Sequence, residues 1–250
     1  MNSPKGVWQV RGTILQIAVG LPRDLPEETH GDRAHKAWTT AFYKYPTSQR
    51  VALRYLGLEG DGQADLKVHG GRDKAVLCYS SAHYRRWKED LKERPEAHAM
   101  VDRKQFGPAA FGENLTIKKM SEESVCVGDI YHVGSATVQV SQPRRPCWKL
   151  ARRWNLPQLT VWAIQTGRMG WYLRVLDEGE VVQGDELILV DRPHPDWSIQ
   201  RLNRIFHFEK KNLEAARFLA DCRELSETWQ TEFRKRTQRA ASDQSSSETE

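Results

Sequence analysis

The residue best placed by its neighbours to do chemistry is Cys147, which ends the stretch Pro-Arg-Arg-Pro-Cys. Arg144 and Arg145 are close in sequence, and nearby guanidinium groups favour the thiolate, the reactive and metal-binding form of cysteine. Pro146 restricts the backbone before the thiol and stiffens its presentation. A thiolate is a soft ligand, which suits a soft transition-metal site. The alternative is an ordinary buried cysteine beside Trp148.

A second candidate is the run His69-Gly70-Gly71, which Arg72 and Lys74 follow. Glycines let the backbone approach a ligand closely, and free N–H groups can cradle an anion. The alternative is a glycine-rich turn with an exposed histidine. Nothing in the chain resembles a P-loop, a dinucleotide-binding glycine run, an H-E-x-x-H zinc helix or a nucleophile elbow.

The other three cysteines are expected to be structural. Cys78 and Cys126 lie in apolar runs and are predicted to be small buried hydrophobes. Together with Cys222 and Cys147 they form no C-x-x-C pair and no zinc-ligand spacing. We therefore expect a reduced protein that folds without disulfides.

Composition limits the possible partners. The chain has 250 residues, 39% hydrophobic and 28% charged, with a net charge of +5. A weakly basic chain favours anionic partners, although a solvated basic surface explains the same charge. A nucleic-acid-binding module ranks lower, because the basic residues form no continuous run apart from a cluster at 234–239. No apolar run is long enough to cross a membrane, and no secretory signal begins the chain, so a soluble cytoplasmic protein is expected.

The elements that must position these residues are mostly strands. Strands are predicted at 7–19 (one bent strand or two short ones), about 50–57, 74–79, 171–176 and 186–190, and 125–141 is predicted to form two strands joined at Gly134-Ser135. Glycines punctuate them, and strands and helices do not alternate regularly. That order favours a barrel or a sandwich over a doubly wound sheet. A helix is expected from Ser81 to about Arg94, with Tyr84, Trp87 and Leu91 on one face.

The hydrophobic period becomes helical after a linker at residues 192–196. Three short apolar stripes follow, and they predict a three-helix subdomain too small to be stable unless it docks. The predicted organisation is a β domain over 1–193, the helices over 194–237 and a disordered tail over 238–250, which is rich in serine and acidic residues.

Several ordered blocks of the sequence closely resemble the MOSC domain, which is named for the C-terminal part of molybdenum cofactor sulfurase. The blocks are 57–76, the positions Tyr79, His83, Tyr84 and Trp87, then 111–115, 127–129 and 142–150. The stretch 40–46 and the three helices resemble the stand-alone YiiM-type branch. The resemblance covers roughly 10–235.

The resemblance implies a fold and an activity. The fold would be mainly β with inserted helices, a MOSC β-barrel, followed by the helical subdomain. The activity would be that of a molybdenum-dependent oxidoreductase that reduces N-hydroxylated compounds, such as N-hydroxylated purine base analogues, in detoxification. A separate flavin-dependent reductase would supply the electrons. Apart from the resemblance, the nine tryptophans suggest a partner protein or a homodimer. The alternative is a non-enzymatic cofactor carrier, or a sulfur-transfer protein with a persulfide on its cysteine.

The resemblance also implies roles for individual residues. The cofactor would be the molybdenum cofactor (molybdopterin), with Cys147 as metal ligand and His69 as the second catalytic residue. The residues expected to bind the cofactor are Lys44, Asp61, His69, Gly70, Gly71, Arg72, Asn114, Arg144 and Cys147. Trp148, Tyr79 or Trp87 would pack against its flat ring.

Overall fold

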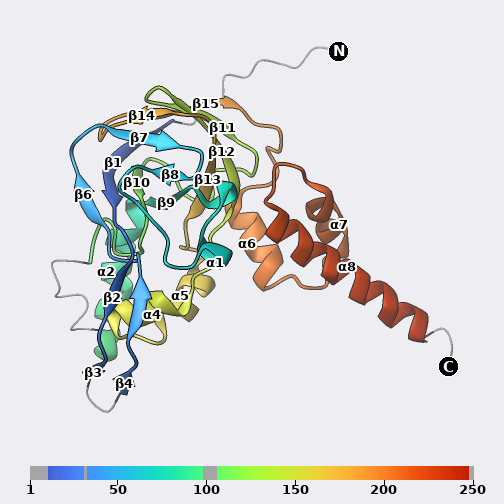
Figure 1. Ribbon diagram of the computed structural model, residues 1–250. Helices are drawn as coiled ribbons and strands as arrows, with labels where there is room; N and C mark the ends of the chain where they lie inside the picture. The colour runs from blue at the N-terminus through green and yellow to red at the C-terminus, as the bar shows by residue number, and fades with distance from the viewer. Residues whose placement is uncertain (1–10, 31–32, 98–105, 248–250) are drawn as a thin grey trace.

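A closed barrel of seven strands forms the body of the protein (Figure 1). The computed structural model describes residues 11–30, 33–97 and 106–247. Around the barrel the strand order is β10, β9, β13, β12, β11, β15 and β1, and β1 closes it by pairing with β10. The bounds are β1 Arg11–Val19, β9 Val76–Ser80, β10 Leu115–Lys118, β11 Ile130–Val133, β12 Ala136–Pro143, β13 Trp171–Asp177 and β15 Glu186–Asp191. The predicted fold class is confirmed.

The barrel interior is filled by the alternate residues of its strands. In β12, Ala136, Val138 and Val140 point inward and are at most 2% exposed, while Thr137 and Gln139 are half-buried. This is the period of two that a sheet with one buried face requires. The pair β9–β10 is parallel, and the other pairs around the barrel are antiparallel.

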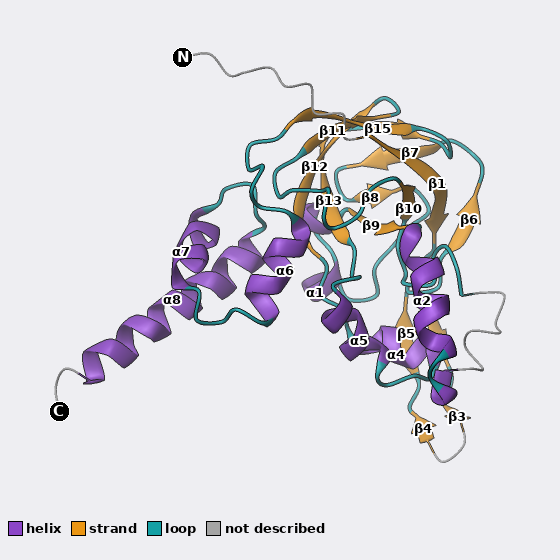
Figure 2. Ribbon diagram, turned by 180° about the vertical axis from the view of Figure 1, so that it is seen from behind, coloured by secondary structure: helices purple, strands orange, loops and turns teal. Residues whose placement is uncertain are grey.

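Short strands and helices decorate the barrel. The strands are β2 Arg23–Leu25 with β5 Trp38–Thr40, β3 Glu28–His30 with β4 Arg33–His35, β6 Tyr45–Thr47 on the edge of β1, and β7 Val51–Arg54 between β8 Gly57–Leu58 and β14 Gly179–Val181. The helical segments are α1 Leu66–His69, η1 Arg72–Lys74, α2 Ala82–Lys92, η2 Pro95–Ala97, α4 Trp148–Trp154 and α5 Leu159–Thr166. Figure 2 shows α2, α4 and α5 gathered at one end of the barrel.

A second apolar core lies beneath α2, α4 and α5. Tyr84, Trp87 and Leu91 are buried on one face of α2, as their spacing predicts. Tyr79 of β9 stacks on Phe111 with ring centroids 4.4 Å apart. This aromatic layer fixes the segment that leads into β10, and that segment forms part of the site described below.

The three remaining helices pack into a separate bundle on the side of the barrel: α6 Ile199–His207, α7 Leu213–Asp221 and α8 Glu227–Ser247 (Figure 1). Ser198 caps α6 by accepting a hydrogen bond from the Arg201 amide, and Asn212 caps α7 in the same way. Trp229 and Phe233 of α8 are buried in the bundle core. The sequence predicted these helices and their stripes.

The bundle docks on the barrel, as its small core requires. Val127, from the turn before β11, is fully buried in the bundle core. Its amide donates to the Trp197 carbonyl at 3.0 Å, and the Ser226 amide donates to the Ser141 carbonyl at 2.9 Å. The predicted linker is also held down, since Arg192 forms an ion pair with the buried carboxylate of Asp129 at 2.6 Å.

The prediction of a disordered tail over 238–250 is corrected by the structure, because α8 continues to Ser247. Residues 234–241 are arginine, lysine, glutamine, threonine and alanine, most of which propagate a helix well once it is nucleated. The buried side chains of Trp229 and Phe233 anchor that nucleus. The final residues of the predicted tail, 248–250, lie outside the described residues. So do residues 1–10 of the predicted β domain, which include 7–10 of the predicted first strand.

No helix in the described part of the chain is both long enough and apolar enough to span a membrane.

Candidate functional site

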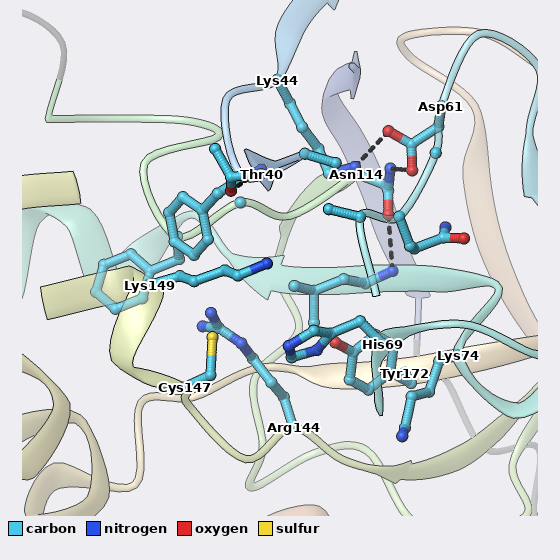
Figure 3. Close-up of a pocket in the computed structure, with 18 of the residues that line it drawn as sticks. Thr40, Lys44, Asp61, His69, Lys74, Asn114, Arg144, Cys147, Lys149 and Tyr172 are labelled. Carbon is cyan, nitrogen blue, oxygen red and sulfur yellow. Dashed lines mark hydrogen bonds and ion pairs between the residues drawn. The ribbon is translucent and has the colours of Figure 1, made fainter. Parts of the chain in front are cut away.

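A pocket opens where the ends of several barrel strands meet the start of α4 (Figure 3). The space inside it, including the solvent at its open mouth, is about 620 Å³. Six of the residues predicted from the sequence line it: Lys44, Asp61, His69, Asn114, Arg144 and Cys147. They come from four separate blocks of the sequence, 40–46, 57–76, 111–115 and 142–150, which the fold brings together.

Cys147 is the residue immediately before α4, in an extended conformation (φ −106°, ψ 168°). Its side chain makes no capping hydrogen bond to the helix and is half-buried. The thiol is therefore available to a ligand in the pocket. Cys78, Cys126 and Cys222 are all buried, as predicted for the first two.

The pocket wall is strongly cationic. It contains five cationic side chains and one carboxylate, namely Lys44, Lys74, Arg144, Arg145 and Lys149 against Asp61. The carboxylate is already neutralised, because the Lys44 ammonium donates to it and both side chains are almost fully buried. Figure 3 shows this pair on the side of the pocket opposite Arg144, Cys147 and Lys149.

Four of the cations have no carboxylate partner within the described ranges: Lys74, Arg144, Arg145 and Lys149. Arg144 is 4% exposed, and its guanidinium makes a long 3.5 Å contact with the Met169 carbonyl. Lys149 donates to the Thr39 carbonyl at 3.3 Å. A buried guanidinium without a counter-charge is costly, so Arg144 favours an anionic ligand, and the more exposed Arg145 and Lys149 add positive charge at the same wall.

Asp61 organises the opposite wall rather than facing the ligand. Its carboxylate accepts from the Gly20 amide at 2.9 Å and from the Asn114 side-chain amide at 2.9 Å, in addition to Lys44. Asn114 in turn accepts from the Leu77 amide at 3.1 Å and so ties Asp61 to β9. Burial lowers the pKa of Lys44, and the attraction of Asp61 opposes that shift.

The turn before β10 places Asn114. Glu113 is fully buried and accepts from the Ala109 amide and the Thr116 hydroxyl, both at 2.8 Å, and from the Tyr84 hydroxyl. Gly112 has φ +75°, and a Cβ there would lie 3.2 Å from the Phe42 ring. Glycine is needed both for the backbone conformation and for this close approach.

His69 lies at the end of α1 and faces the pocket as a neutral base. Burial lowers its pKa, and the charges of Lys149, Lys74 and Arg144 lower it further. The imidazole is therefore uncharged at neutral pH, and its protonated form is a stronger acid than an ordinary imidazolium. Lys74 also has a lowered pKa, from burial and from Arg145.

The other residues of the predicted glycine run do not line the pocket. Gly71 is exposed with φ +92°, and Gly70 is half-buried at the end of α1. Arg72 is exposed, with its guanidinium over the Tyr55 ring at 4.5 Å. The turn through Gly71 sends the Arg72 side chain outward, so its charge is not part of the pocket.

The aromatic rings expected to pack on a cofactor are also elsewhere. Tyr79 and Trp87 belong to the buried aromatic layer, where the Trp87 indole donates to the Tyr79 hydroxyl at 2.7 Å. Trp148 is exposed next to Trp38 and does not line the pocket. The rings that do line it are Phe42, Phe111 and Tyr172.

Lys149, Thr40 and Tyr172 were not singled out from the sequence. Lys149 had a usable signal, because it follows Cys147 by two residues within the block 142–150. Tyr172 had none, since it reaches the pocket through pairing of β13 with β12 opposite Gln142. Arg145 also joins the pocket to the bundle, with its guanidinium 5.5 Å from the centre of the Phe206 ring of α6.

Comparison with known proteins places this geometry in a family. The model of the MOSC domain matches residues 65–188, and that of the YiiM-like, 3-alpha helix domain matches residues 197–240. Protein YflK of Bacillus subtilis is 41% identical over 231 residues, which cover 92% of this chain and 97% of YflK. The crystal structure of YiiM from Geobacillus stearothermophilus is 37% identical, with a TM-score of 0.71, and the match covers 90% of this chain and 99% of that one.

A fungal relative bears on the activity. A protein named reductase from Gibberella moniliformis is 36% identical over 191 residues. The match covers 76% of this chain but 32% of the fungal protein, so this chain corresponds to about one third of that longer protein.

Proposed function

This chain belongs to the MOSC family and contains the YiiM-like three-helix domain, and from that premise we propose that it binds the molybdenum cofactor around Cys147 and reduces N-hydroxylated compounds. N-hydroxylated purine base analogues are the proposed substrate class, with detoxification as the role. Family membership supports the cofactor, and the fungal relative named reductase supports an enzyme that transfers electrons. A flavin-dependent reductase is the proposed electron donor, and the cytoplasm the proposed compartment.

The observation that carries the proposal is a half-buried thiol in a pocket where four cations, Lys74, Arg144, Arg145 and Lys149, lack carboxylate partners among the described residues. A pterin cofactor has a phosphate and a flat ring, and it binds metal through sulfur. The residues present fit that group: Cys147 offers a soft ligand, and the cations offer charge-assisted hydrogen bonds of about 1.5–3 kcal/mol each. Phe42, Phe111 and Tyr172 offer apolar surface for the ring.

When bound, the cofactor would supply two-electron redox chemistry at its metal. Reduction of an N-hydroxyl group consumes two electrons and two protons, breaks the N–O bond and releases water. His69 is the residue placed to deliver a proton, because its neutral ring can take one from solvent and release it readily in this cationic wall. Lys44, Asp61 and Asn114 hold the opposite wall in place.

The test is the metal and pterin content of the protein, purified from a host that makes the cofactor, beside that of Cys147→Ser. We expect molybdenum and oxidised-pterin fluorescence in the unaltered protein and loss of both in the variant, measured by elemental mass spectrometry and fluorescence. Cys126→Ser is the matched control, because that buried thiol lies outside the pocket, and it should keep both signals. Full retention and activity in Cys147→Ser would refute the metal-ligand role.

Assays of N-reduction with an added flavin reductase then separate the activities. Cofactor without turnover would favour the carrier alternative, and neither molybdenum nor pterin would favour sulfur transfer through a persulfide on Cys147. Loss of turnover on His69→Gln with the cofactor retained would support the proton-transfer role of His69.

A further inference from the structure

A second group of metal-ligand side chains lies away from the pocket, where the linker meets the three-helix bundle. His194 belongs to the linker between β15 and α6, and Cys222 and Glu224 belong to the connection between α7 and α8. Their donor atoms all lie within 4.8 Å of one another. Among the described residues, no other group of three or more histidine, cysteine or acidic side chains brings its donor atoms this close together.

We propose that His194, Cys222 and Glu224 bind a divalent zinc ion that clamps the linker to the bundle. No residue of this group lines the pocket around Cys147, so the proposed site is separate from the one assigned to the molybdenum cofactor.

The distances suit a tetrahedral ion. The Nε2 atom of His194 is 2.8 Å from Oε2 of Glu224, and the Sγ atom of Cys222 is 3.8 Å from the same oxygen. Zinc bonds of about 2.0–2.3 Å to nitrogen, oxygen and sulfur place neighbouring ligand atoms about 3.3–3.6 Å apart. To surround an ion, the His194 and Glu224 donors would move about half an ångström further apart and the Cys222 sulfur slightly closer to Glu224, while the His194–Cys222 separation is already within 4.8 Å.

The donor set also suits zinc chemically. One imidazole, one thiolate and one carboxylate are ligands that zinc accepts together, whereas magnesium and calcium prefer oxygen alone. Two anionic ligands neutralise the divalent charge. Binding would release the thiol proton of Cys222 to the buffer, and no change of oxidation state is involved.

The surroundings orient the ligands and leave one side open. Phe218 of α7 meets the His194 ring edge-on with centroids 5.6 Å apart, and it stacks on Trp197 at 4.4 Å. A solvent-open hollow borders the three donors, and Asp221 lines it. A water molecule from this hollow can thus complete the coordination. Arg217 and Arg223 line the same hollow, so the neutralisation of the ion comes from the Cys222 thiolate and the Glu224 carboxylate.

The location explains what an ion would do. Gly128, in the turn that leads into β11, is so close to this corner that a Cβ would lie 2.8 Å from Pro193 and 3.0 Å from Glu224. Barrel, linker and bundle therefore meet here. A zinc ion across the linker and the α7–α8 connection would hold the bundle on the barrel, since metal bound only by the folded state stabilises that state.

The test uses the full chain carrying Cys147→Ser, which removes the half-buried thiol of the pocket. After chelation and dialysis, cobalt(II) is added and the near-ultraviolet thiolate charge-transfer band and visible ligand-field bands are recorded. We expect one equivalent of cobalt with both signatures, displaced by zinc. The thiolate band should be absent from the double variant that carries Cys147→Ser and Cys222→Ser.

His194→Gln is the second variant, because the His194 side chain is 21% exposed and its replacement need not disturb folding. It should weaken zinc binding by at least about 100-fold, since even the partners of ligands change affinity by 10–100-fold. Zinc should raise the melting temperature of the Cys147→Ser protein but not that of the same protein carrying His194→Gln. Cys126→Ser, whose thiol contacts the Pro195 carbonyl, is the matched control and should bind as the parent does.

The proposal is overturned if the Cys147→Ser protein shows no thiolate band, or if the band survives both Cys222→Ser and His194→Gln. It is also overturned if metal binds in excess of one equivalent without that band, which indicates an adventitious ion only. None of these outcomes depends on the molybdenum cofactor, so the two proposals fail independently.

Discussion

Cys147 and Cys222 lie in opposite charge environments. Cys147 faces a wall of five cations, whose single carboxylate is already paired with Lys44. Cys222 lies 3.8 Å from the Glu224 carboxylate, which also contacts His194. The thiol of Cys147 thus lies where an anionic ligand is favoured, and the thiol of Cys222 lies where a metal cation is favoured. Residue type makes a thiol a potential ligand, and the neighbouring charges select its partner.

The largest expected difference between the regions is in stability. Asp61→Asn removes the counter-charge of a nearly buried lysine, and breaking such a pair costs about 3–5 kcal/mol. Glu224→Gln makes the same chemical change where both partners are partly exposed, 31% for Glu224 and 21% for His194, so about 1 kcal/mol or less is expected without metal. Urea unfolding measures both, with the exposed Glu59→Gln as control. Equal losses would contradict the comparison.

The cost of Asp61→Asn should depend on pH. Burial already holds the pKa of Lys44 below its usual 10.5, and removing Asp61 lowers it further. Between the folded value and 10.5 the unfolded chain binds more protons, so the stability of the variant rises with pH across that window. The difference in the free energy of unfolding between the unaltered protein and Asp61→Asn should therefore become smaller as pH is raised from neutral. A constant difference would mean that Lys44 is not the cause.

The next largest effect is in thiol reactivity. Cys147 is half-buried, whereas Cys222 is 5% exposed, so a reagent reaches Cys222 only when the structure opens locally. An opening free energy of about 3 kcal/mol makes the alkylation of Cys222 by iodoacetamide about 100-fold slower. Mass spectrometry of the native protein should show one fast-reacting cysteine, and Cys147→Ser should abolish the fast phase. Comparable rates at the two positions would refute the contrast in exposure.

The smallest effect concerns His69, the histidine of the pocket. Burial and then Lys149 lower its pKa, so Lys149→Gln should raise it part of the way back toward 6.5. Below pH 6.5 the unfolded chain binds a proton that folded His69 does not yet bind. The free energy of unfolding therefore decreases as pH falls from 6.5 through the folded pKa of His69, and this decrease should be smaller in Lys149→Gln. NMR titration of the imidazole measures the shift, with the exposed Lys67→Gln as control. No shift would show that Lys149 does not act on His69.

The sequence by itself determined the architecture and the central residue of the pocket. Alternation in 136–141 predicted the inward face of β12, and helical spacing predicted the buried face of α2. The setting of Cys147 after two prolines and two arginines marked it as a candidate ligand. Such features are readable because burial of a strand or helix face, and backbone restriction by proline, are local properties of the chain.

The tertiary structure alone decided which distant side chains meet. It pairs Lys44 with Asp61, brings Tyr172 into the pocket and turns Arg72 away from it. It also joins His194 to Cys222 and Glu224, although the cysteine spacing predicted no zinc site. Convergence of this kind depends on strand register and on how one element docks against another. Those are set by packing across the whole fold, which no local pattern of residues records.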